Sequence, residues 1–213
     1  MVVAIQLRQL GLVPLLINAG VNLNARNTYG DSALLAAVKK GDQNLAIGLI
    51  DAGVDLNIQD IQRGNNALIV ASERGYLGVV EALINAGVNL NTRNAQGDTA
   101  LMKAVEGNHQ EIVMALIDAG VNLNIQDPEG WTALMMAVES NELGVADALL
   151  MARANRDRVN ADGVTAAILA RENDNSEMIA LFDAMERLEE SERMAVRRVR
   201  HKGYGQAPPM RST

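Results

Sequence analysis

The sequence predicts an all-α protein of the solenoid type, in which similar short units stack on one another. The first observation is a glycine that recurs every 33 or 34 residues after an apolar segment, with Arg153 at the last equivalent position. These residues are Gly20, Gly53, Gly87, Gly120 and Arg153. A second series keeps the same period: Gly30, Gly64, Gly97, Gly130 and Gly163. Such a period is typical of repeat proteins, whose units bury a core only by stacking.

Each unit opens with a predicted short helix that follows the second glycine. Its first residue is Ser, Asn or Thr, whose side chain can accept a hydrogen bond from a free backbone N–H group. The Ala, Leu, Ile and Met residues that follow form an apolar stripe. The segments are Ser32–Ala37, Asn66–Ala71, Thr99–Ala104, Thr132–Ala137 and Thr165–Ala170.

A second helix is predicted after a turn such as Lys40–Asp42. Its apolar residues recur at helical spacing, as in Ile112, Val113 and Leu116. It ends at Ala-Gly, where glycine can adopt the left-handed conformation that closes a helix. The Val-Asn-Leu-Asn segment that follows leads into the next unit, and one extra residue lies in the loop around Ile61–Arg63.

This order of helix, turn, helix and extended loop resembles the ankyrin repeat. The resemblance rests on the period, the Gly-x-Thr-Ala-Leu start, the apolar second helix and the Ala-Gly-Val-Asn joint. It covers about residues 1–184, with units at 1–27, 28–60, 61–94, 95–127, 128–160 and 161–184. The family usually has Thr-Pro-Leu-His where this chain has Thr-Ala-Leu-Met or a close relative. The residues at that histidine position are expected to make apolar contacts instead: Leu35, Ile69, Met102 and Met135.

The two ends of the array depart from the pattern. The first unit begins within its first helix, and Pro14 predicts that its second helix starts near Leu12, since an interior proline costs about 3 kcal/mol. Near the other end, Arg153 and Arg156 replace a glycine and a leucine, as expected where no later unit covers the surface. A charged helix over 185–202 and a disordered tail over 203–213 are predicted to follow.

Composition limits the function further. The chain has no cysteine, which excludes disulfides and thiolate chemistry but leaves the compartment open. Residues before Arg193 carry a net charge of −13 (13 basic against 26 acidic residues), and the rest carry +6. An acidic body favours a partner with a basic surface and disfavours nucleic acid and anionic membranes. No apolar run reaches transmembrane length, and a cytoplasmic location is expected, with secreted and periplasmic locations left open.

No group of residues indicates catalysis. His109 and His201 have no second histidine with which to share a metal, and His109 is interpreted as a turn residue. Asp51 and Asp118 recur at one repeat position, as scaffold residues do. The prediction is therefore a protein that is not an enzyme and that uses no cofactor, metal or small-molecule substrate.

In the family that this chain resembles, partners bind a concave surface formed by the loop tips and the first helices. The positions that map to this surface and are predicted to contact a partner are Tyr29, Lys39, Lys40, Arg63, Arg74, Glu106, Glu129, Trp131 and Glu139. Trp131 differs in type from its equivalents, and we interpret it as an aromatic anchor. The alternative is that it packs locally over Pro128 or Met135.

The sequence is compatible with three functions. The preferred one is a non-catalytic module that binds a protein or peptide on its concave face. The first alternative is an inhibitor or immunity-type protein that neutralises a basic toxin or enzyme through acidic surface. The second is an effector or adaptor whose basic tail contacts nucleic acid.

Overall fold

The structure is a computed structural model that describes residues 1–6, 11, 15, 16 and 18–203. Within these ranges the side chains of residues 6, 189 and 195–203 are outside the description. The predicted helix start near Leu12 and the predicted tail beyond Gly203 lie outside the described residues.

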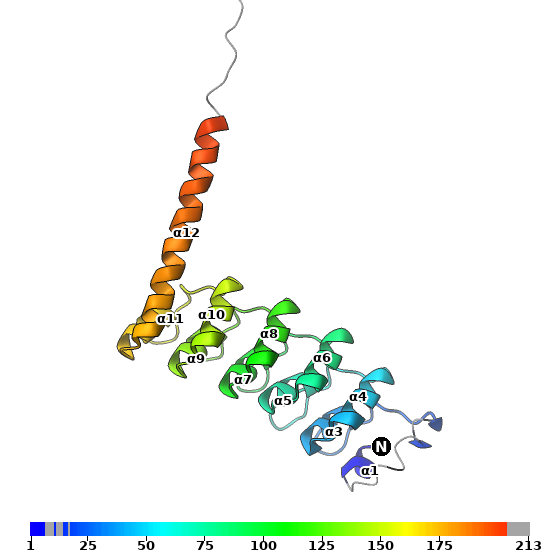
Figure 1. The fold of residues 1–213 in the computed structure, drawn as a ribbon. Coiled ribbons are helices and arrows are strands. Elements are labelled where there is room, and N and C mark those ends of the chain that lie inside the picture. Colours follow the sequence, from blue (N-terminus) through cyan, green and yellow to red (C-terminus); the bar gives the residue numbers. More distant parts are fainter. Residues whose placement is uncertain (7–10, 12–14, 17, 204–213) are drawn as a thin grey trace, which may run out of the picture.

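Pairs of short helices stack side by side along the described chain, as Figure 1 shows. A partial first unit contributes α1 (Val2–Gln6), which packs on α3. The pairs that follow are α3 (Ala33–Lys40) with α4 (Gln43–Asp51), α5 (Ala67–Glu73) with α6 (Leu77–Asn85), α7 (Ala100–Glu106) with α8 (Gln110–Asp118), α9 (Ala133–Glu139) with α10 (Leu143–Met151), and α11 (Ala166–Glu172) with α12 (Ser176–Gly203). The described residues contain no strand, which confirms the predicted all-α class.

The predicted caps define where the helices begin and end. The side chains of Ser32, Asn66, Thr99, Thr132 and Thr165 each accept a hydrogen bond from the backbone N–H group three residues later. After the second helices, the chain turns through positive φ at Gly20, Gly53, Gly87, Gly120 and Arg153. Arg153 adopts φ +66° without the freedom of glycine, which is strained for a residue with a Cβ atom.

The core runs through the stack as one continuous cluster of aliphatic side chains. Leu35, Ile69, Met102 and Met135, at the usual histidine position, are almost completely buried in it. Each inner first helix packs between two others, as α5 does between α3 and α7. These first helices contain no aromatic residue, and their small and aliphatic side chains let them approach closely.

The joints between units are linked by side-chain hydrogen bonds that repeat with the period. The amide oxygens of Asn24, Asn57, Asn91 and Asn124 accept from the backbone N–H groups of residues in the next joint, at 2.7–3.0 Å. These bonds hold neighbouring loops in register. The loop tips are therefore fixed by the scaffold before any partner arrives.

The C-terminal part of the chain does not divide into a last repeat and a separate charged helix, as the sequence predicts. The predicted boundary between residues 184 and 185 falls inside α12, which begins at Ser176 and continues without a break to Gly203. The second helix of the last unit and the charged segment are one helix, because no Gly or Pro interrupts the sequence between them. This helix extends away from the stack (Figure 1). No helix of the described chain is both long and apolar enough to cross a membrane.

Candidate functional site

The loop tips form one edge of the array, and an Asp or Asn side chain organises each of them. In the loop at residues 27–31, Asn27 Oδ1 accepts from the backbone N–H groups of Tyr29 and Asp31, both at 2.9 Å. The equivalent residues Asp60, Asn94, Asp127 and Asn160 also accept backbone N–H groups of their own loops. Each tip is thus a compact turn with a defined direction.

Backbone hydrogen bonds join the tips of neighbouring loops. The N–H group of Ile61 donates to the carbonyl oxygen of Tyr29 at 3.0 Å, and Ala95 and Ala161 donate in the same way to Arg63 and Glu129 at 2.8 Å. The equivalent donor position in the remaining loop is Pro128, which has no N–H group. Its ring instead packs beside Gly97.

The most exposed apolar pair on this edge is formed by Tyr29 and Ile61. Their exposed fractions are 52% and 71%, and their backbones are held together by the hydrogen bond just described. Tyr29 was predicted as a contact residue, whereas Ile61 was not. The available signal was the extra residue of this loop, which separates Gly30 and Gly64 by 34 rather than 33 positions.

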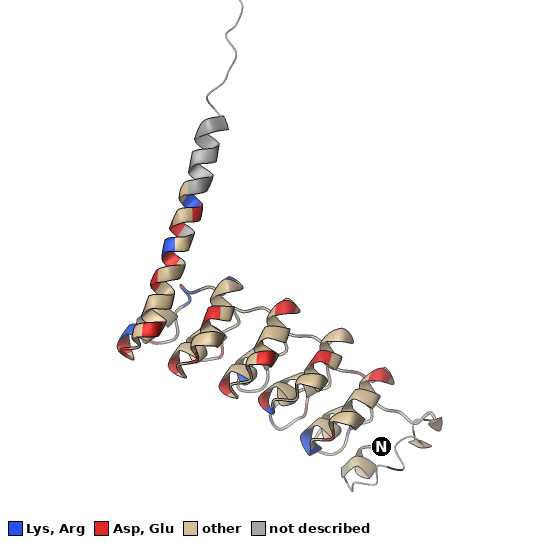
Figure 2. Ribbon diagram, viewed as in Figure 1, with Lys and Arg blue, Asp and Glu red and all other residues tan. Residues whose placement is uncertain are grey.

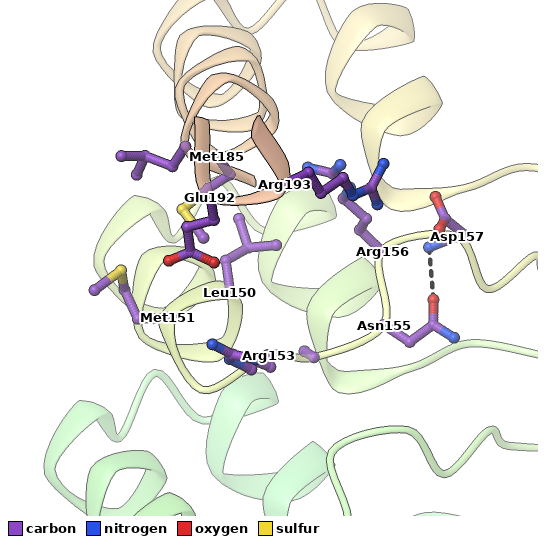
Figure 3. A pocket seen from close by; sticks show the side chains of 11 residues that line it. Leu150, Met151, Arg153, Asn155, Arg156, Asp157, Met185, Glu192 and Arg193 are labelled. Atoms are coloured by element: carbon purple, nitrogen blue, oxygen red, sulfur yellow. Dashed lines mark hydrogen bonds between the residues drawn. The ribbon is translucent and has the colours of Figure 1, made fainter. Parts of the chain in front are cut away.

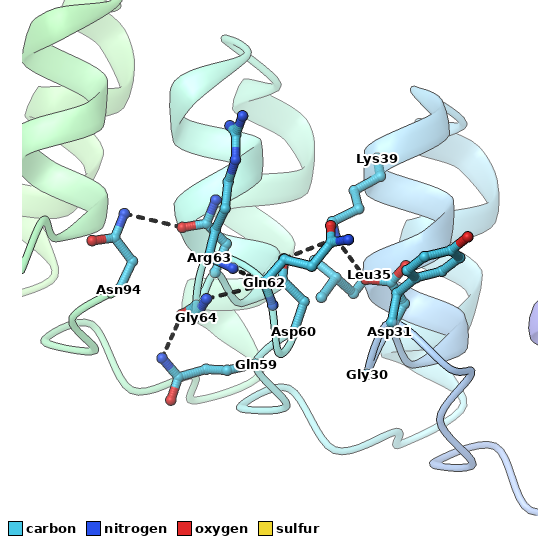
Figure 4. Close-up of polar contacts among 12 residues, drawn as sticks. Gly30, Asp31, Leu35, Lys39, Gln59, Asp60, Gln62, Arg63, Gly64 and Asn94 are labelled. Atoms are coloured by element: carbon cyan, nitrogen blue, oxygen red, sulfur yellow. Dashed lines mark hydrogen bonds and ion pairs between the residues drawn. The ribbon is translucent and has the colours of Figure 1, made fainter. Parts of the chain in front are cut away.

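Lys39 has a structural position that its predicted contact role did not anticipate. Its Nζ lies 2.6 Å from Asp31 Oδ1 and 2.8 Å from Asp60 Oδ2, and both carboxylates are buried (Figure 4). Lys39 therefore ties together two successive loops. Its ammonium group serves the scaffold.

This ion pair shifts the pKa values of its members. Burial works against the charged form of Lys39, but hydrogen bonds to Asp31 and Asp60 and the attraction of their charges raise its pKa overall. Burial likewise opposes the charged form of Asp60, while hydrogen bonds from Lys39 and from the backbone of Arg63 and Gln62 lower its pKa. The ionised pair is the stable form at neutral pH.

A second ion-paired lysine stands on α7. Lys103 Nζ lies 2.9 Å from Asp98 Oδ2 and 2.6 Å from Glu106 Oε2. Burial works against its charge, yet the bonds to Glu106 and Asp98 raise the pKa of Lys103. Glu106 itself stays exposed on the surface.

The remaining predicted contact charges are exposed, and acidic residues occur on every helix pair of the array (Figure 2). Lys40, Arg63 and Arg74 lie on the units that carry Tyr29 and Ile61. One glutamate per unit lies near the end of each later first helix, and we call these four residues the acidic stripe: Glu73, Glu106, Glu139 and Glu172. Glu139 accepts a hydrogen bond from Asn173 Nδ2 at 3.1 Å, and Glu129 is exposed at a loop tip.

The side chain of Trp131 is less accessible to a partner than its position on the loop tip predicts. Its side chain is partly buried and packs against the core, and its backbone N–H donates to Asp127 Oδ1 at 2.7 Å. Local packing, the alternative interpretation from the sequence, therefore explains much of the position of this side chain. The register placed Trp131 on the tip but could not tell which way its ring folds.

His109 lies in the turn before α8, as interpreted from the sequence. Its Nε2 is 3.2 Å from the carbonyl oxygen of Glu73, and its ring lies against Gly75 of the preceding unit. Burial raises the pKa of the nearby Glu142, although the charge of His109 acts in the opposite direction. Among the described residues, no three His, Cys, Asp or Glu side chains are grouped to hold a metal ion.

A groove of about 830 Å³ lies at the C-terminal end, away from the loop tips (Figure 3). Its walls are the end of α10, the joint that follows it, and the middle of α12. Met151, Met185 and Leu188 supply apolar surface. Charged residues of both signs surround them: Arg153, Arg156, Asp157, Glu192 and Arg193.

Comparison with known proteins agrees with this architecture. A family model described as ankyrin repeats (3 copies) matches residues 1–94 and 68–160. The structure is also similar to the crystal structure of an ankyrin repeat domain from Acinetobacter baumannii, with 31% sequence identity and a TM-score of 0.81 over 87% of this chain and 96% of that one. A search of curated proteins gives no significant match.

The stacked helix pairs and their fixed loop tips define a repeat protein of the kind that presents an extended surface. The chain belongs to the ankyrin repeat family. Ankyrin repeats are generally protein–protein interaction modules and generally carry no catalytic function.

Proposed function

We propose that this protein binds a protein or peptide partner on its loop-tip and first-helix surface, with the Tyr29–Ile61 pair as the apolar centre. The observation that carries this proposal is the exposure of two large apolar side chains on adjacent, hydrogen-bonded loops. An exposed apolar cluster with a charged surround is typical of a binding surface.

Rigidity supports the same proposal. The hydrogen bond from the next joint to Asn24, the tip-to-tip hydrogen bond and the Lys39 ion pairs hold the first loops in place. A surface that is already ordered loses little conformational entropy when a partner binds. Affinity can then come from a few side chains rather than from a large contact area.

Charge suggests how the partner is oriented. Lys40, Arg63 and Arg74 lie on the units that carry the apolar pair, whereas Glu106, Glu129, Glu139 and Glu172 lie on later units. A partner with acidic and apolar residues at one end and basic residues at the other would complement this surface. Such complementarity mainly selects orientation and raises the association rate.

A photo-crosslinking experiment tests the location of the surface. A photoreactive amino acid is placed at position 29 or 61, and a matched control carries it at Met114 on α8, which is also exposed. We expect one common protein to be captured from positions 29 and 61 and not from position 114. Capture of the same protein at equal yield from all three positions would refute the proposed surface.

The acidic stripe motivates a second candidate, an inhibitor or immunity-type protein that blocks a basic protein. Its four glutamates face outward at one per unit, and the body of the chain carries −13. Association would then slow steeply as salt is added, because electrostatic steering is screened. The triple change E106Q/E139Q/E172Q should slow association with the captured partner, and D51N/E81Q/E111Q on the second helices is the control. Equal effects of the two triple changes would remove this candidate.

A further inference from the structure

The charge order of α12 is the feature that the interaction surface leaves unexplained. Residues 176–192 of this helix contain six acidic residues and one arginine, a net charge of −5. Residues 193–203 contain five basic and no acidic residues, a net charge of +5. The sign changes between Glu192 and Arg193.

The helix dipole does not account for this order. A dipole favours acids in the first turn and bases in the last turn, and its effect falls off beyond them. The residues on either side of the sign change lie more than two turns from both ends of the 28-residue helix. Their arrangement requires another explanation.

The segregation of charge is also unfavourable within a single helix. Glu186 and Glu190 are four residues apart, as are Arg193 and Arg197, and like charges at this spacing repel. Attraction at the same spacing is limited to Asp183 with Arg187 and Glu189 with Arg193, and residues 194–203 contain no acidic partner for their four basic residues. The helix packs on α10 and α11 and then extends beyond the stack (Figure 1). A lone helical extension of this length has little stability of its own in water.

We propose that α12 pairs with α12 of a second copy of this chain in an antiparallel arrangement. A two-fold axis between Glu192 and Arg193 places residues 183–192 of each helix opposite residues 193–202 of the other. Every acidic stretch then faces a basic one, and the same contact is made twice. The paired segment is 20 residues, or about 30 Å, long.

Apolar surface is present at the same place. Leu188 on α12 is 57% exposed, and Met151, across the groove, is 67% exposed. In the proposed register, Leu188 and Met185 lie opposite Arg197 and Arg200 of the second helix, and Val196 and Val199 are the residues before these two arginines in the sequence. The groove wall beyond α12 carries Arg153, Arg156 and Asp157, so the pairing relies on the two helices rather than on that wall.

The antiparallel direction also separates the two acidic arrays. They lie at opposite ends of the helix pair, farther apart than the Debye length of about 8 Å in physiological salt. A parallel pair would instead place both arrays side by side and match acid with acid. The charge order therefore selects both a second copy as the occupant and its direction.

Sedimentation equilibrium of the full chain tests this proposal through charge reversal. One variant makes the helix basic, with E186K/E189K/E190K/E192K, and another makes it acidic, with R193E/R197E/R198E/R200E. We expect the unchanged chain to have twice the monomer mass of 22.8 kDa, and each variant alone to be a monomer. A mixture of equal amounts of the two variants should restore the doubled mass.

A charge-reversed α12 could unwind when its variant is alone in solution, and the mixture of the two variants still tests the pairing in that case. Circular dichroism should then show helix content rising on mixing, as the opposite charges combine.

The control is D51K/E81K/E111K/D147K on the second helices, which should leave the doubled mass unchanged. A monomeric unchanged chain, or reversed variants that do not combine, would overturn the proposal. Either result would leave the Tyr29–Ile61 surface untouched, because that surface is tested by crosslinking.

Discussion

The backbone N–H group of Ile61 donates a hydrogen bond to the carbonyl oxygen of Tyr29 across 3.0 Å. This bond joins the tips of two successive repeats at two residues whose side chains are both large, apolar and exposed. Below it, Lys39 joins the same two loops through Asp31 and Asp60. The hydrogen bond and the ion pairs thus form a polar framework that supports the exposed apolar pair.

Replacing Lys39 by methionine should destabilise the fold. The change leaves two buried carboxylates without their cation, which should lower the free energy of unfolding by roughly 3 kcal/mol. K40M is the matched control, because Lys40 is exposed at the next position, and it should change stability by less than about 0.5 kcal/mol. Urea unfolding of both variants measures the difference. Equal midpoints would show that the ion pair contributes nothing.

The effect of K39M should depend on pH in a defined direction. The pKa of Asp60 is lowered in the folded state, so its contribution is present above its ordinary value of 3.8 and is lost as pH falls through the folded-state pKa. The pKa of Lys39 is raised, so its contribution is complete below 10.5 and is lost as pH rises through the higher folded value. The Tm difference between the wild-type protein and K39M should therefore be widest at neutral pH and shrink at both extremes. A constant difference from neutral to strongly acidic pH would contradict the ion-pair explanation.

Alanine at position 30 should be worse tolerated than alanine at position 53. Both glycines have positive φ, +81° and +75°, so each substitution carries a backbone cost of roughly 1 kcal/mol or more. A Cβ atom at position 30 would also lie 2.8 Å from Ile61 Cγ2 and 2.9 Å from its backbone nitrogen, whereas the space at Gly53 is open. Thermal melts should rank the wild-type protein first, G53A second and G30A last. A G30A protein as stable as G53A would mean that the two tips are not in contact.

Glu142 offers a stabilising change. One carboxylate oxygen is buried without a hydrogen-bond partner, and burial raises the pKa of the group above its ordinary value of 4.5. The folded state therefore prefers the protonated form, and stability is lost as pH rises from 4.5 through the folded-state pKa. E142Q should raise Tm at pH 7, and its advantage should disappear at pH 3. E139Q, on an exposed carboxylate, is the comparison that should show little change.

Much of this architecture can be read from the period of the sequence. Ser32 and Thr99 begin their helices as caps, and Gly53 and Gly87 adopt the positive φ expected after the second helices. These features are local, so residue type and spacing are enough to predict them. The fixed period then predicts the stacking.

The details of the surface could not be predicted in the same way. Register places Lys39 and Glu106 at equivalent positions, yet Lys39 bridges two loops because buried carboxylates happen to lie on both sides of it. Trp131 is on a tip but packs against the core, while Ile61 is exposed where an extra residue widens its loop. Side-chain direction depends on neighbours in adjacent units, which spacing alone does not reveal.

The most direct test of the account is the affinity of the crosslinked partner for Y29A/I61A, measured by isothermal titration calorimetry beside the control M114A. Removing a central apolar pair should weaken binding by about 30-fold or more, since hot-spot truncations cost about 2 kcal/mol or more. M114A should bind as the wild-type protein does, and unchanged urea midpoints in both variants would show that the fold is intact. An affinity for Y29A/I61A equal to that of the wild-type protein would contradict the central claim that this pair anchors the partner.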